Sequence, residues 1–202
     1  DWLFGKDPQV TESILDQFGK GSLSNITQHS IFLRNKRSAE YNYLTAAGRS
    51  IMPPRYAENH SISNRNRLFR AARKFRAAIY ADPRRGEAYL DLAEAKNMLG
   101  QTDEAKRILH SMLARYPKWI KSADAAQGYF RLGQLSPCED AVASFQNSLD
   151  TGNLGLQRAE VRDHLADCHE ALGQHEPAIR LRERMWREDF TNWRREKLGR
   201  SY

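Results

Sequence analysis

The 202-residue sequence has little of what secreted and membrane-embedded proteins depend on. Its two cysteines, Cys138 and Cys168, cannot form the several disulfides that stabilise a small secreted domain. Nothing at the N-terminus of the given sequence resembles a secretory signal, and the sequence lacks the apolar run of roughly 18 or more residues that a membrane-spanning helix needs. We therefore expect an intracellular protein that does not insert into a membrane.

The first residue is Asp1 rather than methionine, so we expect a processed chain or part of a longer one. A cleaved mitochondrial presequence would explain this start. The sequence does not decide between a mitochondrial and a cytoplasmic location.

Catalytic and metal-binding patterns are also scarce. Gly19-Lys20-Gly21-Ser22 lacks the leading glycine of a phosphate-binding loop and follows no buried strand, so we interpret it as a turn. His164 and Cys168 share a helix face at a spacing that zinc can use, but two ligands do not make a closed site. Acidic pairs such as Asp103-Glu104 stand at expected helix starts, where they favour the helix dipole. The sequence thus predicts no enzyme, cofactor or metal site.

One spacing, by contrast, recurs four times in the C-terminal two thirds of the chain. Each copy begins with an alanine and continues in steps of four, three and five residues. The copies are Ala71-Phe75-Ala78-Pro83, Ala105-Leu109-Met112-Pro117, Ala141-Phe145-Ser148-Asn153 and Ala178-Arg182-Met185-Phe190. The leading alanines lie 34, 36 and 37 residues apart. A period of this length indicates stacked helical hairpins.

The second copy is the clearest. It predicts helices at 87–99 and 103–115, with Gly100 between them and Pro117 after the pair. The stretch from Gly86 to Trp119 resembles a tetratricopeptide repeat, in which small and aromatic residues of the second helix pack on a Leu-small pair and an aromatic of the first. The resemblance covers residues 63–190 and implies an all-α solenoid of three complete hairpins.

The other copies differ from the second in detail. The third fits with a two-residue insertion near Ser136-Pro137. In the fourth, Arg182 stands where a core aromatic residue is expected. Upstream of the first copy, Pro53-Pro54 would interrupt a first helix, so we expect that unit to contribute only its second helix.

Residues 1–62 do not share the period. A short amphipathic helix is expected to begin at Asp7-Pro8 and to end at Gly19-Lys20-Gly21. We therefore divide the chain into an N-terminal arm and linker at 1–62, a repeat domain at 63–190 and a basic C-terminal helix or tail at 191–202. We expect the arm to pack along its own repeats or on a neighbouring subunit.

In tetratricopeptide arrays the first helix of each hairpin lines a concave groove. The resemblance implies that these residues form the groove: Glu87, Leu90, Glu94, Asn97, Met98, Phe130, Glu160, Asp163, Asp167 and Glu170. Leu90 and Glu94 stand where members that hold acidic peptide C-termini have lysine and asparagine. An acidic groove of this kind suits a basic or apolar partner segment.

The formal net charge of +7 is unevenly distributed, because the repeats are acidic and both flanks are basic. A cluster before the first clear repeat comprises Arg67, Arg70, Arg73 and Lys74. It is either the solvated face of a terminal helix or a strip that contacts RNA phosphates. The leading hypothesis is a non-enzymatic scaffold subunit of a larger intracellular assembly, with other protein subunits as partners. The alternative is an RNA-associated subunit, for example of an organellar ribosome.

Overall fold

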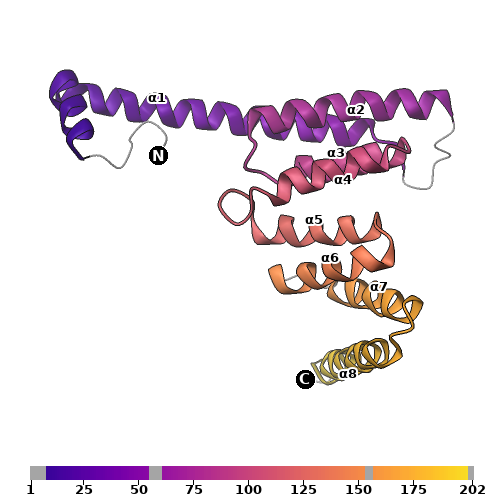
Figure 1. The fold of residues 1–202 in the computed structure, drawn as a ribbon. Helices are drawn as coiled ribbons and strands as arrows, with labels where there is room; N and C mark the ends of the chain where they lie inside the picture. The colour runs from indigo at the N-terminus through magenta and orange to yellow at the C-terminus, as the bar shows by residue number, and fades with distance from the viewer. Residues whose placement is uncertain (1–7, 55–60, 153–156, 200–202) are drawn as a thin grey trace.

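The computed structural model is a stack of helices (Figure 1). It describes the backbone of residues 8–54, 61–152 and 157–199, and side chains within 30–54, 61–152 and 157–188. The helices are α1 Pro8–Ile51, α2 Ile62–Ala81, α3 Glu87–Met98, α4 Thr102–Leu113, α5 Ser122–Gln134, α6 Cys138–Thr151, α7 Gln157–Ala171 and α8 His175–Gly199. The described ranges contain no strand, so the predicted all-α class is confirmed. None of their helices is long and apolar enough to cross a membrane.

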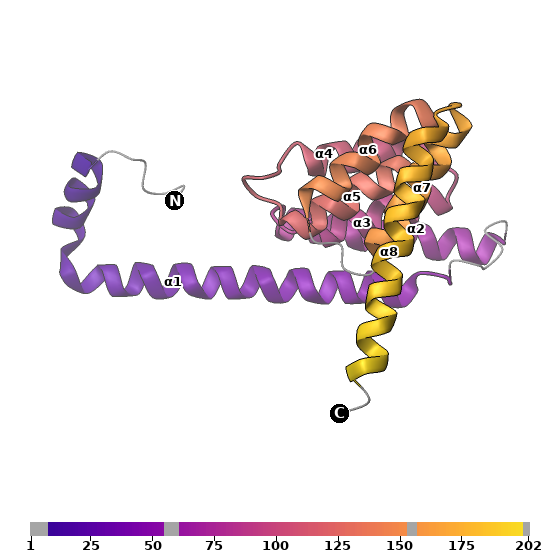
Figure 2. The same ribbon diagram turned by 90° about the horizontal axis from the view of Figure 1, so that it is seen from below.

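Neighbouring helices pack in pairs, α1 on α2, α3 on α4, α5 on α6 and α7 on α8, and each pair packs on the next. The first helices of the second and third pairs, α3 and α5, also contact each other. The pairs descend in chain order from α1 and α2 to α8, and α1 projects sideways from the stack (Figures 1 and 2). This is the arrangement expected of a helical solenoid.

Two hairpin turns depend on glycine. Gly100 and Gly173 have φ angles of 75° and 72°, in the left-handed region that favours glycine. After each glycine, the next N–H donates to a carbonyl five residues earlier, from Gln101 to Lys96 at 2.9 Å and from Gln174 to His169 at 2.8 Å. A left-handed glycine followed by a hydrogen bond of this kind is a common way to end a helix. Gly100 precedes Ala105 by five residues and Gly173 precedes Ala178 by five, so the second and fourth copies share the same turn.

The third hairpin has no insertion at its turn. Residues 135–137 separate α5 from α6, as residues 99–101 separate α3 from α4. The extra length lies in the connection 114–121, which is longer than the connection 82–86 between α2 and α3. The predicted insertion near Ser136-Pro137 is therefore wrong. Pro137 instead precedes α6 with a φ of −64°, a value that its ring fixes.

Helix α1 changes the expected organisation of the N-terminal part. It does not end at Gly19-Lys20-Gly21 but continues to Ile51, and it packs on α2. A Cβ atom on Gly48 would lie 2.4 Å from Cε1 of Phe75, so the two helices approach closely here. Pro53-Pro54 follow α1 rather than interrupt it. The first unit therefore has both of its helices.

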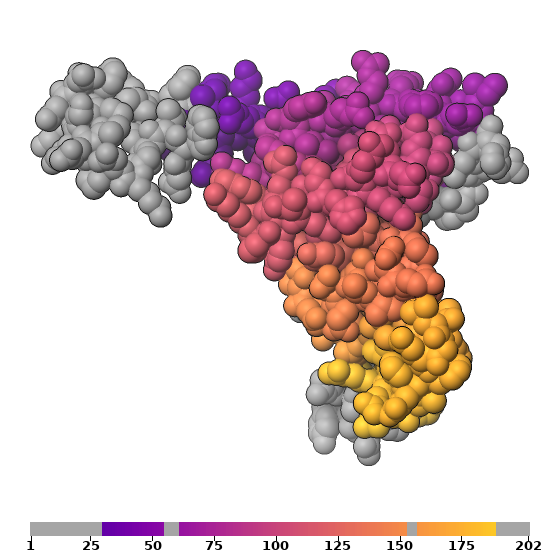
Figure 3. Space-filling model, in the orientation of Figure 1, coloured from indigo at the N-terminus to yellow at the C-terminus, as the bar shows by residue number. Residues whose placement is uncertain are grey.

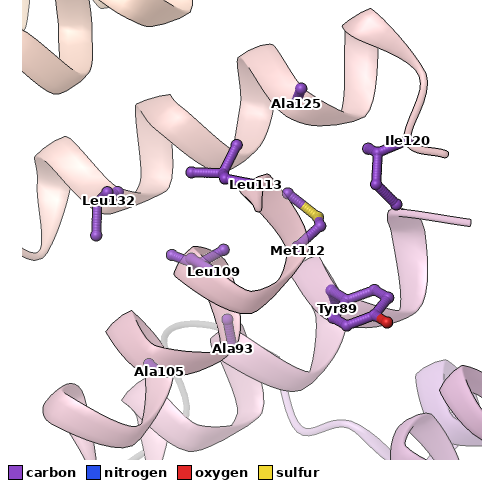
Figure 4. Packing of buried hydrophobic residues seen from close by; sticks show 9 residues of the cluster. All are labelled: Tyr89, Ala93, Ala105, Leu109, Met112, Leu113, Ile120, Ala125 and Leu132. Carbon is purple, nitrogen blue, oxygen red and sulfur yellow. The ribbon is translucent and has the colours of Figure 1, made fainter. Parts of the chain in front are cut away.

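Apolar side chains between the helices form a core that continues from pair to pair. Figure 4 shows the buried cluster that forms between the second hairpin, the connection after it and α5. Its members are Tyr89, Ala93, Ala105, Leu109, Met112, Leu113, Ile120, Ala125 and Leu132. Small alanines on both helices allow the close crossing that the repeat resemblance implies.

Candidate partner-binding groove

The first helices of successive pairs are linked by polar side chains along one side of the stack. The links are Arg49 to Asp91 at 2.7 Å, Arg131 to Glu94 at 2.7 Å and Gln127 to Gln157 at 3.4 Å. They join α1 to α3, α3 to α5 and α5 to α7. Most of the residues predicted to form a groove lie on these first helices, α3, α5 and α7.

Several of the predicted groove acids are already paired within the chain. Glu87 lies 3.2 Å from Arg85, and Arg182 lies 2.8 Å from both Asp167 and Glu170. The Arg182 guanidinium, by hydrogen bonding, holds the pKa of Glu170 below its ordinary value. The acids of the groove are therefore largely neutralised by arginines of the same molecule.

Glu160 and Asp163 on α7 differ from these acids. Both are exposed, and no ion pair involves them within the described part of the chain. The negative charge that a partner can meet is therefore concentrated at the α7 end of the groove. Asp91, further along the groove, has a pKa raised by burial, against which the Arg49 ion pair acts.

Phe130 belongs to the core rather than to the groove. Its ring centroid lies 5.9 Å from that of Phe145 and 5.6 Å from that of His164, and its side chain is buried. Assigning Phe130 to the groove was wrong, because the side of α5 that carries it packs on α6 and α7. His164 is engaged in the same aromatic cluster, and Cys168 is buried beside it in the core.

A hollow of about 90 Å³ lies between α3 and α5. Its lining includes four polar side chains, Glu94, Asn97, Arg131 and Gln134. The exposed amides of Asn97 and Gln134 can each donate and accept hydrogen bonds. Two other predicted groove residues, Leu90 and Met98, are half-buried on α3. Leu90 and Met98 pack against the core, whereas the apolar lining of the hollow comes from Ala93, Leu109 and Leu135.

A second hollow, of about 250 Å³, lies on α2, α3 and α4. Ile79, Leu92 and Ile108 supply its apolar walls, and Arg107 lies at its polar part. No sequence motif indicated this hollow. It is formed by residues of two adjacent pairs rather than by one hairpin.

The four basic residues predicted to contact phosphate have different surroundings. Arg67 donates to the backbone carbonyls of Ile51 at 3.0 Å and of Met52 at 3.5 Å, so it caps the end of α1. Lys74 lies 6.0 Å from the ring of Tyr43. Arg70 and Arg73 are exposed on α2. Arg67 therefore has a structural task that the sequence analysis did not predict.

Tyr41 is a key residue that the sequence analysis missed. Its side chain is fully buried, and its hydroxyl oxygen accepts a hydrogen bond from the backbone N–H of Ala88 at 2.9 Å. The Arg85 guanidinium lies 3.9 Å from the centre of its ring. Burial raises the pKa of Tyr41 to about 12. Tyr41 thus fixes α1 to the start of α3, and no local pattern around it signals this long-range contact.

Comparisons with known proteins agree with this geometry. Residues 66–137 match the tetratricopeptide repeat family. The solved structure titled "Crystal structure of MamA" is 12% identical to this chain with a TM-score of 0.52. The match covers 80% of this chain and 95% of that chain. The structure titled "Crystal structure of MamA protein" is 12% identical with a TM-score of 0.51. That match covers 90% of this chain and 93% of the other. No curated protein matches the chain. The chain thus has a helical repeat fold, of which residues 66–137 match the tetratricopeptide repeat family.

Proposed function

We propose that this protein is a non-enzymatic scaffold subunit of a larger protein assembly. It holds a basic or apolar segment of a partner in the groove lined by α3, α5 and α7. The tetratricopeptide match supports the protein-binding class. The observation that carries the proposal is the row of linked first helices, which leaves a hollow of about 90 Å³ with exposed amides at its edge.

Charge favours a basic segment at one end of this groove. Glu94 and Asp167 already bind arginines of the chain, whereas Glu160 and Asp163 are exposed without an ion pair among the described residues. A lysine or arginine of a partner would therefore gain most near α7. Complementary charge of this kind contributes to partner choice and to the rate of encounter.

The α1 arm supports attachment to further subunits. Ile31, Phe32 and Leu33 are 51%, 62% and 39% exposed. Three consecutive helical residues point to different sides of a helix. Large apolar side chains exposed together on one segment are typical of a surface that binds another protein. In Figure 3 the described part of α1 lies at the edge of the stack, where a partner can reach it.

The test is quantitative recovery of partner proteins with the full-length chain and with a double variant, Glu160→Lys and Asp163→Lys. The matched control is Asp150→Lys and Glu183→Lys, which reverses two exposed acids on the second helices α6 and α8. Like charge in the groove should reduce partner recovery by roughly tenfold or more, and the control should not. Equal recovery with both variants would exclude the α7 end of the groove as the binding site.

A further inference from the structure

Three segments meet on the side of the stack from which α1 projects. The connections 82–86 and 114–121 both lie on this side (Figures 1 and 2). Arg85 lies over the ring of Tyr41, and Arg84 lies 4.6 Å from the ring centre of Trp119. The Gly86 N–H donates to Oδ2 of Asp124 at 3.2 Å. These contacts fix the two connections to each other and to α1.

The segments bring together a set of cations that we term the basic corner. Its members are Arg34, Arg37, Arg84, Arg115, Lys118 and Lys121, all of them exposed. Arg34 and Arg37 precede Tyr41 by seven and four residues in α1, so they continue the helix face that docks on the stack. The other four come from the two connections, Arg84 from 82–86 and the remaining three from 114–121.

Three acids lie near the basic corner, Asp82, Glu87 and Asp124; the charge of Lys121 acts on the Asp124 carboxyl, but none of the three forms an ion pair with a corner cation among the described residues. Asp82 accepts a hydrogen bond from the backbone N–H of Arg84 at 3.2 Å, and Asp124 accepts one from Gly86. Glu87 pairs with Arg85, which is not a member of the corner. Within the described residues, none of the six corner cations forms an ion pair.

We propose that the basic corner binds the phosphate backbone of single-stranded RNA. The cations extend from α1 across two connections, as an extended polyanion requires, rather than converging on one carboxylate. Trp119 is 41% exposed among them, and interleaved aromatic and basic side chains are typical of single-strand binding surfaces. The proposal is independent of the groove, because it uses other elements.

Trp119 also orders the cations beside it. The guanidinium of Arg84 lies 4.6 Å from its ring centre and the Lys118 ammonium 5.0 Å. Attraction to the ring restricts these two long side chains before a ligand arrives. Less side-chain entropy is then lost when phosphates bind.

The test measures binding of a fluorescein-labelled single-stranded RNA of mixed sequence by fluorescence anisotropy at several salt concentrations. A triple variant, Arg84→Gln, Lys118→Gln and Lys121→Gln, should raise the Kd by roughly tenfold. It should also flatten the slope of log affinity against log salt by about 2, since each phosphate contact on a single strand contributes about 0.7. All three side chains are exposed, so circular dichroism should match that of the parent and the melting midpoint should shift by no more than about 2 °C.

The matched control removes three exposed cations of α2 by Arg65→Gln, Arg70→Gln and Arg73→Gln. This control should keep nearly all of the affinity. An equal loss in both variants would show diffuse attraction to a basic protein, and a larger loss in the control would place RNA on α2. Absence of salt-dependent RNA binding by the parent overturns the proposal. So does equal competition by polyglutamate, which would indicate an acidic protein partner.

The groove variant Glu160→Lys and Asp163→Lys separates this site from the proposed scaffold function. It should bind RNA at least as well as the parent, because it leaves the basic corner intact. Loss of RNA binding in this variant would place the RNA in the groove and overturn the basic corner as its site. Failure of partner recovery alone leaves the RNA result unaffected.

Discussion

The first and last helix pairs have the same arrangement but different chemistry at equivalent positions. In the first pair, Phe75 of α2 is fully buried and its ring lies against the backbone of Gly48. In the last pair, the equivalent residue is Arg182, which is exposed and binds Asp167 and Glu170. The same helical spacing can thus be held by apolar burial or by surface ion pairs.

The two solutions differ in strength. Burial of a phenyl ring contributes several kcal/mol, whereas exposed ion pairs contribute little and are screened by salt. The last pair keeps buried Leu165 and Ala178, and Arg162 is buried beside Glu188. At the position of Arg182, the last pair nevertheless makes fewer apolar contacts than the first pair makes at Phe75. We therefore expect the last pair to open before the first.

The largest effect is expected for Phe75→Ala. Removing this fully buried ring should lower the free energy of unfolding by about 3–5 kcal/mol, because it removes apolar contacts and leaves a cavity. Urea denaturation followed by circular dichroism measures the loss. The control is Phe69→Ala in the same helix, where the side chain is 44% exposed and the change should be about 0.5 kcal/mol or less. Equal losses would mean that Phe75 does not fill the first pair.

A smaller effect is expected for Gly48→Ala, which should cost about 1–3 kcal/mol. The new Cβ would lie 2.4 Å from Cε1 of Phe75. Alanine is the better helix former, so a net loss can come only from this contact. Phe75→Leu added to Gly48→Ala should recover part of the stability, as a double-mutant cycle measures. Strictly additive losses would show that the two residues do not meet.

Tyr41→Phe should cost about 1–3 kcal/mol at neutral pH, because the buried N–H of Ala88 loses its acceptor. Thermal or urea unfolding measures this loss. The control is Tyr43→Phe two residues later, where the ring is exposed and the stability should stay near that of the parent. An unchanged Tyr41→Phe protein would mean that water replaces the hydroxyl.

The same tyrosine predicts how stability changes in base. Its pKa is raised by burial from 10.0 to about 12, so the folded state keeps the proton longer than the unfolded chain does. The resulting stabilisation is fully present below pH 10 and is lost as the pH rises from about 10 to about 12. Tyr41→Phe should flatten this part of the profile. A profile with the same slope in both proteins would assign the decline to other groups.

Sequence reasoning recovered the hairpins because their signals are local. Gly100 and Gly173 mark two turns directly, and the alanine spacing marks the helix that follows each turn. It did not recover the first helix of the first pair, because Tyr41 meets Ala88 at a distance of 47 residues along the chain. The contact of Gly48 in α1 with Phe75 of α2 resembles no repeat motif either.

The charge of the groove was predicted only in part for a related reason. Glu94 is acidic as expected, but Arg131, 37 residues later, binds it from the next repeat. A partner one repeat away cannot be seen in the composition of a single helix. Glu160 and Asp163 stay candidates because no such arginine reaches them among the described side chains.

The smallest effect is expected for Arg182→Leu, which replaces the ion pairs of the last pair with an apolar side chain. The melting midpoint should shift by no more than about 2 °C, since exposed substitutions change stability little. The lowered pKa of Glu170 contributes to the stability of the folded protein above pH 4.5, its ordinary pKa. This contribution is lost as the pH falls below that value, and Arg182→Leu should lack it.

Hydrogen exchange of α8 amides is the sharper measurement. In the parent, added salt should speed exchange there, because it screens Arg182 from Asp167 and Glu170; in the variant it should not. Equal salt sensitivity in both proteins would show that these ion pairs do not hold α8 on α7, and the contrast with Phe75 would then rest on apolar burial alone.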